Sequence, residues 1–325
     1  MNREEYQEVM QEQSKEELLQ EEAHTQKKKR KKTFGENEAP VWRWIVGAVL
    51  GLVVGSLIGS AASLGAGALP FLQDGQFLAP ERALITGMLS FAGIYVGLCL
   101  GIRVFCKTRM RSFYFGAGRK ADIKSMLIVG GLYIAGMMLS MLFSIGSISY
   151  AGNPISLILV NLLLCLLLVW IQTSTEEIIF RGFFLRVPYK NIVPRLPKGL
   201  FAAIISSLLF MAAHLYNPEV TTQSGLTVAV AASTYFITAM GMFFANLVIG
   251  GMEGGLIIHF INNFFCFFFL QAEVSALVTP TLFIDRSQGG GTAYKELGSL
   301  LVAYVPAMIY LIWRLKKQKA GEDQA

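Results

Sequence analysis

Two adjacent carboxylates, Glu176 and Glu177, close an apolar segment that begins near residue 155. Each ionised carboxylate loses hydration that lipid cannot replace, so such a pair in a membrane-length segment needs partners. On a helix, Glu177 and Arg181 stand four residues apart on one face, with the acid on the N-terminal side as the favourable order requires. Glu176 is rotated away by about 100° and stays free for a second partner. We therefore predict that Glu176 does chemistry, while Glu177 and Arg181 hold it in place.

Two histidines, His214 and His259, lie in apolar segments downstream of the acidic pair, and Asn263 follows His259 by four residues. A lone histidine in such a segment more often makes a hydrogen bond between helices than it catalyses a reaction. Several polar groups in one region of a membrane protein, however, are most stable when they contact each other. We therefore expect the side chains of Glu176, His214, His259 and Asn263 to lie within about 8 Å of one another.

These residue types suit the hydrolysis of an amide bond. A carboxylate and an imidazole can activate water, and His259 and Asn263 share a helix face from which both can donate to a developing oxyanion. Glu176, His214 and His259 could instead hold zinc or another divalent metal, which would carry the water. The sequence contains no His-Glu-x-x-His motif, so its spacing gives a metal no special support.

The elements that position these residues are predicted to be membrane helices. The chain has 325 residues, of which 54% are hydrophobic and 15% charged, a composition typical of an all-α polytopic membrane protein. We expect about eight transmembrane helices, the fourth of which continues to Arg186 before Pro188 ends it. They are placed at about residues 42–64, 84–106, 125–145, 155–177, 200–215, 226–249, 256–270 and 297–313.

Most basic residues fall into segments that would share one face of the membrane. They lie in the N-terminal tail, two internal loops and the C-terminal tail, whereas Arg82, Arg286 and Lys295 lie in the opposite set of loops. The positive-inside rule then places both termini in the cytoplasm, in an integral protein of a bacterial-type plasma membrane. The net charge of +6 therefore reports topology and contact with anionic membrane lipid, and it does not indicate a nucleic-acid partner.

Two of the predicted helices carry glycines at a spacing of four. Small residues let helices approach closely where lipid supplies no hydrophobic drive, so we expect these two helices to pack tightly. The glycines of the first helix are Gly47, Gly51, Gly55 and Gly59, and those of the second are Gly93, Gly97 and Gly101.

Three short motifs occur in order on successive predicted helices: Glu-Glu-x-x-x-Arg from Glu176, Phe-x-x-x-His from Phe210 and His-x-x-x-Asn from His259. Together they resemble the CPBP family, which comprises the CAAX prenyl endopeptidases and the bacterial bacteriocin-processing and immunity proteins called Abi. The resemblance covers about residues 155–275, a four-helix catalytic core. It implies an intramembrane endopeptidase whose active site opens toward the cytoplasm and whose substrate is a membrane-anchored peptide or protein.

Carried over onto this sequence, the resemblance implies a role for each motif residue. The general base would be Glu176, assisted by His214, and the resemblance favours a mechanism that requires no metal cofactor. The remaining roles would be stabilisation of the oxyanion by His259 and Asn263 and support of the site by Glu177, Arg181 and Phe210. Glu253 lies outside the family pattern, and we expect it to be a solvated loop acid.

The chain is predicted to have four parts. They are a charged cytoplasmic tail (residues 1–40), three helices with glycine ridges (41–150), the CPBP-like core (151–275), and an external loop with the last helix and a basic tail (276–325). Two other functions fit parts of this organisation. A non-catalytic bacteriocin self-immunity or scaffold protein would keep the fold without turnover. A proton-coupled transporter would also place acids and histidines in the membrane, but inverted repeats and broken helices are not visible.

Overall fold

The computed structural model describes residues 39–67, 79–116, 118–186, 199–287 and 292–322. Within these ranges the chain is an all-α polytopic membrane protein, as the sequence predicts. Six of its helices are long and apolar enough to cross a membrane. These six spans are Val41–Ala66, Leu84–Val104, Ile123–Ser144, Ile155–Leu185, Leu226–Ile249 and Thr292–Ala320.

The predicted fifth and seventh spans are shorter than the other six. They are the apolar helices Leu200–Ala213 and Glu253–Phe269. At 1.5 Å per residue these helices are about 21 and 26 Å long, less than the roughly 30 Å of a hydrocarbon core. Eight apolar helices are therefore present at the predicted places, but two of them are too short to cross a membrane alone.

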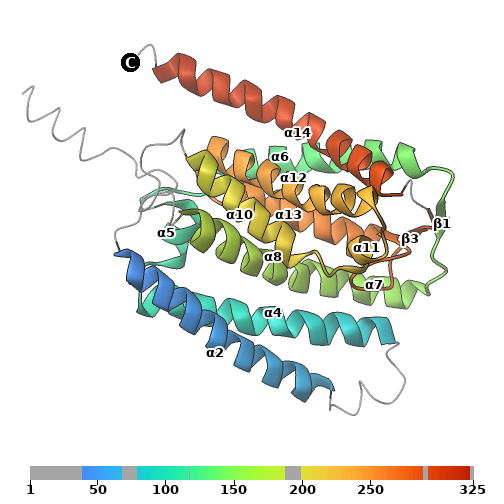
Figure 1. Ribbon diagram of the computed structural model, residues 1–325, viewed down its shortest axis with the longest axis horizontal. Coiled ribbons are helices and arrows are strands. Elements are labelled where there is room, and N and C mark those ends of the chain that lie inside the picture. Colours follow the sequence, from blue (N-terminus) through green and yellow to red (C-terminus); the bar gives the residue numbers. More distant parts are fainter. Residues whose placement is uncertain (1–38, 68–78, 117, 187–198, 288–291, 323–325) are drawn as a thin grey trace, which may run out of the picture.

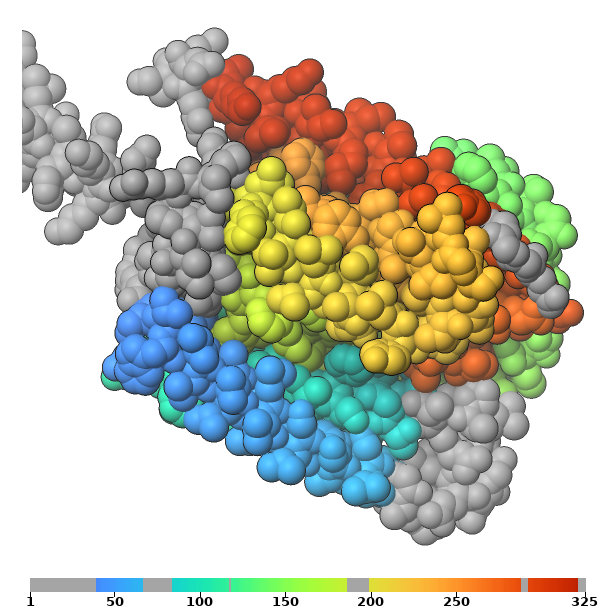
Figure 2. Space-filling model, viewed as in Figure 1, coloured from blue at the N-terminus to red at the C-terminus, as the bar shows by residue number. Residues whose placement is uncertain are grey.

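The helices lie side by side and form a bundle with two distinct ends (Figure 1). One end is called the basic end. Four helices begin there, namely α2 (Val41–Gly67), α6 (Ile123–Ser140), α10 (Leu200–Ala213) and α13 (Glu253–Phe264). Three helices end there, namely α4 (Ala79–Val104), α12 (Leu226–Ile249) and α14 (Thr292–Glu322). At the other, called the sheet end, lie β1 (Ile148–Tyr150), β2 (Leu270–Ala272) and β3 (Phe283–Asp285). Figure 2 shows α10 and α12 covering the centre of one face, with α2 along its edge.

Helices α2 and α4 pack through facing glycines, which confirms the predicted tight contact. A Cβ atom added at Gly97 would lie 2.2 Å from the backbone oxygen of Gly51. One added at Gly93 would lie 2.2 Å from the backbone nitrogen of Gly59. The two backbones therefore leave no room for even a methyl group between them.

We expect Gly97→Ala to lower the melting temperature of the detergent-solubilised protein. The added methyl group meets backbone atoms of α2, so no change of rotamer relieves the overlap and the helices must separate. The expected loss of stability is about 1–3 kcal/mol. Gly65→Ala on α2 is the matched control, because a Cβ atom there meets nothing within 4 Å. Equal melting temperatures for the two variants would contradict the close approach.

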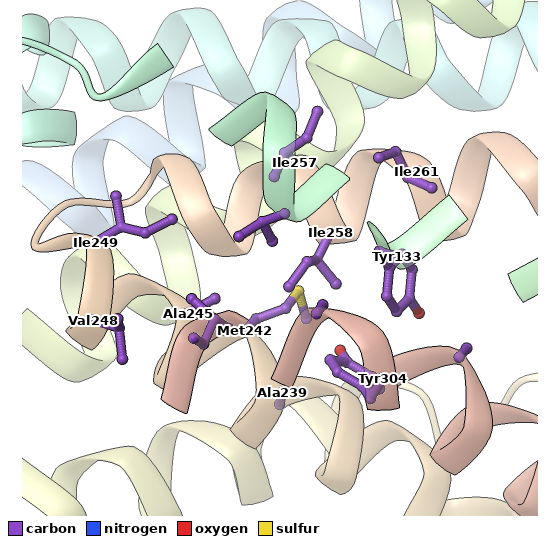
Figure 3. Packing of buried hydrophobic residues seen from close by; sticks show 14 of the residues in the cluster. Tyr133, Ala239, Met242, Ala245, Val248, Ile249, Ile257, Ile258, Ile261 and Tyr304 are labelled. Atoms are coloured by element: carbon purple, nitrogen blue, oxygen red, sulfur yellow. The ribbon is translucent and has the colours of Figure 1, made fainter. Parts of the chain in front are cut away.

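Helix α13 is held by the main cluster of buried apolar side chains (Figure 3). Ile257 and Ile261 lie against Gly130 of α6, and Ile258 is fully buried in the same cluster as Met242 of α12. In lipid, close packing of this kind holds helices together. It fixes the rotation of α13 and thereby the direction of the next side chain, His259.

Two ion pairs, one with a buried carboxylate, lie at the basic end. Glu253 is 1% exposed, lies 2.8 Å from Arg119 and accepts a hydrogen bond from the backbone of Asp122. Arg314 of α14 pairs with Asp122 at 2.6 Å. The prediction of a solvated Glu253 is therefore wrong. Helix α13 begins at this residue, where an acid is favoured by the helix dipole, and Arg119 compensates its charge.

A small sheet, which the sequence did not predict, lies in the region expected to be loop. Strand β3 pairs antiparallel with β1 and parallel with β2. Each strand has only three residues and its partners are far away in the sequence, so no local alternation of polar and apolar residues predicts it. Helix α14 is tied to this sheet by Asp285, which binds Lys295 at 2.9 Å and also accepts hydrogen bonds from Ser144 and Ser147.

We expect the stability of the sheet end to depend on pH. Burial raises the pKa of Asp285, but hydrogen bonds from Ser147, Ser287, Ser144 and Lys295 outweigh it and bring the pKa well below the ordinary 3.8. The ionised carboxylate therefore stabilises the fold above about pH 4, and this contribution disappears as the pH falls through the lower folded-state value. We expect Asp285→Asn to melt at a lower temperature than the wild type at pH 7. Below about pH 4 the difference should shrink, and a constant difference at every pH would contradict this origin.

Parts of the predicted organisation lie outside the described ranges. The charged tail is described only from residue 39, and Pro188 and the glycines at 289–291 are also outside. The fourth helix does continue to Arg186, as predicted. The division into four parts stays a prediction.

Candidate active site

The helix that carries the acidic pair contains two π-helical segments. It consists of α7 (Ile155–Leu164), the π-helical η2 (Cys165–Val169), α8 (Trp170–Glu177) and the π-helical η3 (Ile178–Arg186). π-Helical turns are rare and occur frequently at functional sites. Here they flank α8, whose residues from Gln172 to Glu177 are all buried despite being polar.

Glu177 and Arg181 form the ion pair that their spacing predicts. Nη1 of Arg181 lies 3.2 Å from Oε1 of Glu177, and the two residues are 1% and 0% exposed. The guanidinium also lies over the ring of Phe210, 4.7 Å from its centroid, which is a cation–π contact. Each charge of such a buried pair depends on the other, because water cannot replace a missing partner.

His259 lies between the two glutamates. Its Nδ1 is 2.9 Å from Oε1 of Glu177, and its Nε2 is 3.3 Å from Oε2 of Glu176. An ionised carboxylate only accepts hydrogen bonds, so both contacts are favourable when each ring nitrogen carries a proton. With Arg181 and both glutamates charged, a protonated His259 also makes the buried group electrically neutral.

Gln172 links Glu176 to Asn263. Its Nε2 donates to Oε1 of Glu176 over 2.5 Å, and its Oε1 accepts from Nδ2 of Asn263 over 3.0 Å. Asn262 and Tyr133 extend this chain, since Asn262 donates to Asn263 and accepts from the Tyr133 hydroxyl. Gln172 was not among the predicted site residues. Its position four residues before Glu176, on the same helix face, is the signal that could have found it.

His214 follows the last residue of α10 and lies beside this group. Its Nδ1 is 2.7 Å from the carbonyl oxygen of Phe210, which can only accept, so Nδ1 donates and Nε2 stays available. The imidazole is stacked between two rings, with centroid distances of 4.4 Å to both Phe210 and Tyr235. The Phe210 ring is in turn 5.7 Å from that of His259. Between the described residues, no hydrogen bond joins His214 to either glutamate.

The four side chains expected to meet are thus related in different ways. Glu176 contacts His259 directly and reaches Asn263 through Gln172. His214 is one aromatic ring away from His259 and lines the same cavity as the other three. That all four lie within about 8 Å stays a prediction where it concerns His214.

A cavity of about 1190 Å³ begins at these residues and extends toward the sheet end. Glu176 lines its inner part, and Oε2 of this residue is buried 3.3 Å from Nε2 of His259. The side chain as a whole is only 8% exposed. A carboxylate beside an imidazole at the inner part of a cavity is the combination that activates water for attack.

The residues of the zinc alternative do not converge on one point. Both ring nitrogens of His259 face carboxylates, and Nδ1 of His214 faces a carbonyl oxygen. In the part of the chain that the structure describes, no group of three or more His, Cys, Asp or Glu is arranged to hold a metal ion. The donor set of the described residues thus does not fit zinc. Independence of the reaction from metals stays a prediction.

The comparison with protein families identifies the central part of the chain. Residues 156–265 match the type II CAAX prenyl endopeptidase Rce1-like family. This segment is Rce1-like. It contains both glutamates, both histidines and Asn263, so the match confirms the resemblance indicated by the three motifs. The Rce1-like segment supports, at the level of the family, an intramembrane protease of the CAAX type.

One curated relative is an uncharacterized protein, YyaK, of Bacillus subtilis (strain 168). It is 33% identical over 162 residues, which are 49% of this chain and 50% of YyaK. The match therefore spans about half the length of this relative. No solved structure matches the chain.

Proposed function

We propose that the protein is an intramembrane endopeptidase that hydrolyses a peptide bond in a membrane-associated substrate with water activated by Glu176. One observation carries the proposal. The Glu176 carboxylate lines the cavity beside an imidazole, with its Oε2 3.3 Å from Nε2 of His259. General-base catalysis needs an acceptor of this kind close to the water that it deprotonates. The Rce1-like segment supports the same class of reaction.

In the proposed reaction, a water molecule in the cavity gives a proton to Glu176 while its oxygen attacks the carbonyl carbon of the scissile bond. His259 and Asn263 donate hydrogen bonds to the oxyanion that forms. Glu176 then passes the proton to the amide nitrogen, and the carbon–nitrogen bond breaks. The products are a carboxylic acid and an amine, so the atoms and protons of one water molecule are fully accounted for.

Neighbouring side chains act as positioning residues in this scheme. Glu177 binds Nδ1 of His259, which leaves Nε2 directed at Glu176, the arrangement of an imidazole oriented by a third group. The Asn263 amide nitrogen carries two protons, of which Gln172 binds one, so the second is free for the oxyanion. Nε2 of His214 can assist Glu176 through water in the same cavity.

The surroundings of the site are part of the proposal. The six long apolar helices make the protein an integral membrane protein. We place both termini in the cytoplasm of a bacterial-type plasma membrane because of the distribution of basic residues. The substrate is proposed to be a membrane-anchored peptide of the CAAX type or of the leader or bacteriocin type, with membrane lipid as the other partner.

Proteoliposomes that contain the purified protein test the proposed function. The substrates are unmodified, prenylated and leader-type membrane-anchored peptides, and mass spectrometry identifies the products. We expect cleavage at one bond with new carboxylic acid and amine ends, at a rate unchanged by thorough chelation. Absence of cleavage across all peptides would favour the non-catalytic scaffold. If chelation abolishes cleavage and added zinc restores it, the result supports the metal alternative.

A further inference from the structure

A chain of four hydrogen bonds leads from helix α6 to the proposed general base. The hydroxyl of Tyr133 on α6 donates to Oδ1 of Asn262 over 3.1 Å, and Nδ2 of Asn262 donates to Oδ1 of Asn263 over 3.2 Å. Nδ2 of Asn263 then donates to Oε1 of Gln172, and Nε2 of Gln172 donates to Oε1 of Glu176. The chain therefore connects three helices, α6, α13 and α8.

All four hydrogen bonds point in the same direction. An ionised Glu176 only accepts hydrogen bonds, so Gln172 has to turn its amide nitrogen toward it. The amide oxygen of Gln172 then faces Asn263, which has to present its own nitrogen. The same rule applies at Asn262, and the chain begins at the Tyr133 hydroxyl, which has one proton to donate. Each of the three amides therefore has one orientation that satisfies both of its neighbours.

The orientation of the Asn263 amide matters for the proposed reaction. The nitrogen and the oxygen of an amide group are nearly equal in size, so its hydrogen bonds select between the two orientations. In the observed orientation Nδ2 lies on the side of Gln172, and its second proton can bind the oxyanion. In the reversed orientation the amide oxygen would take this place and would repel the oxyanion. A device that prevents the reversal therefore protects the reaction.

Tyr133 anchors the far end of the chain. The residue is 0% exposed and belongs to the main cluster of buried apolar side chains, where its ring centroid lies 5.0 Å from that of Tyr304. Packing thus holds the hydroxyl in place independently of the site. Tyr133 also lies outside the Rce1-like segment of residues 156–265, whereas the other members of the chain lie inside it.

We propose that Tyr133 is a positioning residue, which acts through Asn262 to hold the Asn263 amide in the orientation that donates to the oxyanion. Gln172 holds the same amide from the side of Glu176. The effect on cleavage rests on the proposed function. The coupling between the two ends of the chain does not, because it is a property of the folded protein.

The kinetics of Tyr133→Phe test the positioning role. The variant keeps the ring and loses one hydroxyl, so the Asn262 amide is no longer fixed. We expect kcat to fall about threefold to tenfold, the effect of one buried hydrogen bond, while KM stays unchanged because the oxyanion exists only in the transition state. Tyr310→Phe is the matched control, since its hydroxyl donates to Ser125 of the same helix α6 outside the chain. Equal kcat values for the two variants, or a change in KM alone, overturn the proposal.

The variant Asn263→Ala tests whether Tyr133 acts through Asn263. Once the amide of Asn263 is absent, the chain is interrupted and the Tyr133 hydroxyl has nothing left to orient. We expect Tyr133→Phe to lower kcat by less than about twofold in this background. A further loss of threefold to tenfold overturns the proposal.

Melting temperatures of the detergent-solubilised variants test the chain without any cleavage. Tyr133→Phe and Gln172→Met each interrupt it at one end, so the second interruption should cost less than the first. We expect the fall in melting temperature of this double variant to be smaller than the sum of the two single falls. For Tyr310→Phe combined with Gln172→Met the falls should add. Additive falls in both double variants overturn the proposal, whereas coupled falls in a protein that cleaves no peptide support the chain and contradict only the proposed function.

Discussion

Replacing Glu176 by glutamine is expected to abolish peptide cleavage while the protein still folds. Glutamine has the same size as glutamate and can keep a hydrogen bond to Gln172, which now holds Oε1 of Glu176. Its amide cannot take a proton from water, so the general base is lost. We expect the rate to fall by about 10²–10⁴-fold, the range in which a positioned acid or base contributes.

The measurement is kcat/KM on a cleaved membrane-anchored peptide in proteoliposomes, together with the melting temperature of each variant. Glu322→Gln is the control, because it makes the same chemical change at the last residue of α14, at the basic end. We expect it to cleave like the wild type. A Glu176→Gln protein that is folded and cleaves at the wild-type rate would show that another group is the base.

Replacing Arg181 by alanine is expected to destabilise the protein strongly. Glu177 would remain at 0% exposure without its ion-pair partner, and the guanidinium that lies over Phe210 would leave an empty volume. Breaking a buried pair by removal of one partner costs about 3–5 kcal/mol. The yield of folded protein and the melting temperature in detergent should both fall. Arg103→Ala is the control, since Arg103 is exposed at the end of α4.

A double variant separates the loss of charge balance from the loss of volume. Glu177→Gln combined with Arg181→Met removes both charges and keeps most of the volume, so it should be more stable than Arg181→Met alone. Its activity should stay low, because glutamine at position 177 no longer stabilises a protonated His259. A double variant as unstable as Arg181→Met would contradict the charge-pair explanation, and one with full activity would remove Glu177 from the proposed mechanism.

The contacts of the site that lie within a single helix were predictable from the sequence. The pairing of Glu177 with Arg181 follows from a spacing of four, and so does the contact of Gln172 with Glu176, which the same rule could have found. The close approach of α2 and α4 follows from glycines at the same spacing. Such contacts are predictable because the pitch of the helix is known before the fold is.

Contacts between helices were less predictable. His259 was expected to lie near Glu176 and to act together with Asn263, but its contact with Glu177 was not predicted. Glu253 was expected in solvent and is buried against Arg119. The three-residue strands that place Asp285 next to Lys295 have no recognisable pattern in the sequence. These arrangements depend on how far each helix is rotated and shifted, and no spacing within one helix contains that information.

The sequence by itself therefore determined that the chain is a bundle of membrane helices, where those helices lie and which polar residues share a face. The physical reason is local: lipid requires apolar surfaces and internally bonded backbones, and helical pitch sets the faces. Only the tertiary structure decided that His259 sits between Glu176 and Glu177, and that their cavity extends toward the sheet end. Those outcomes follow from the packing of α13 against α6 and α12, which sets the rotation of His259, and from the ion pair that holds the start of α13 at the basic end.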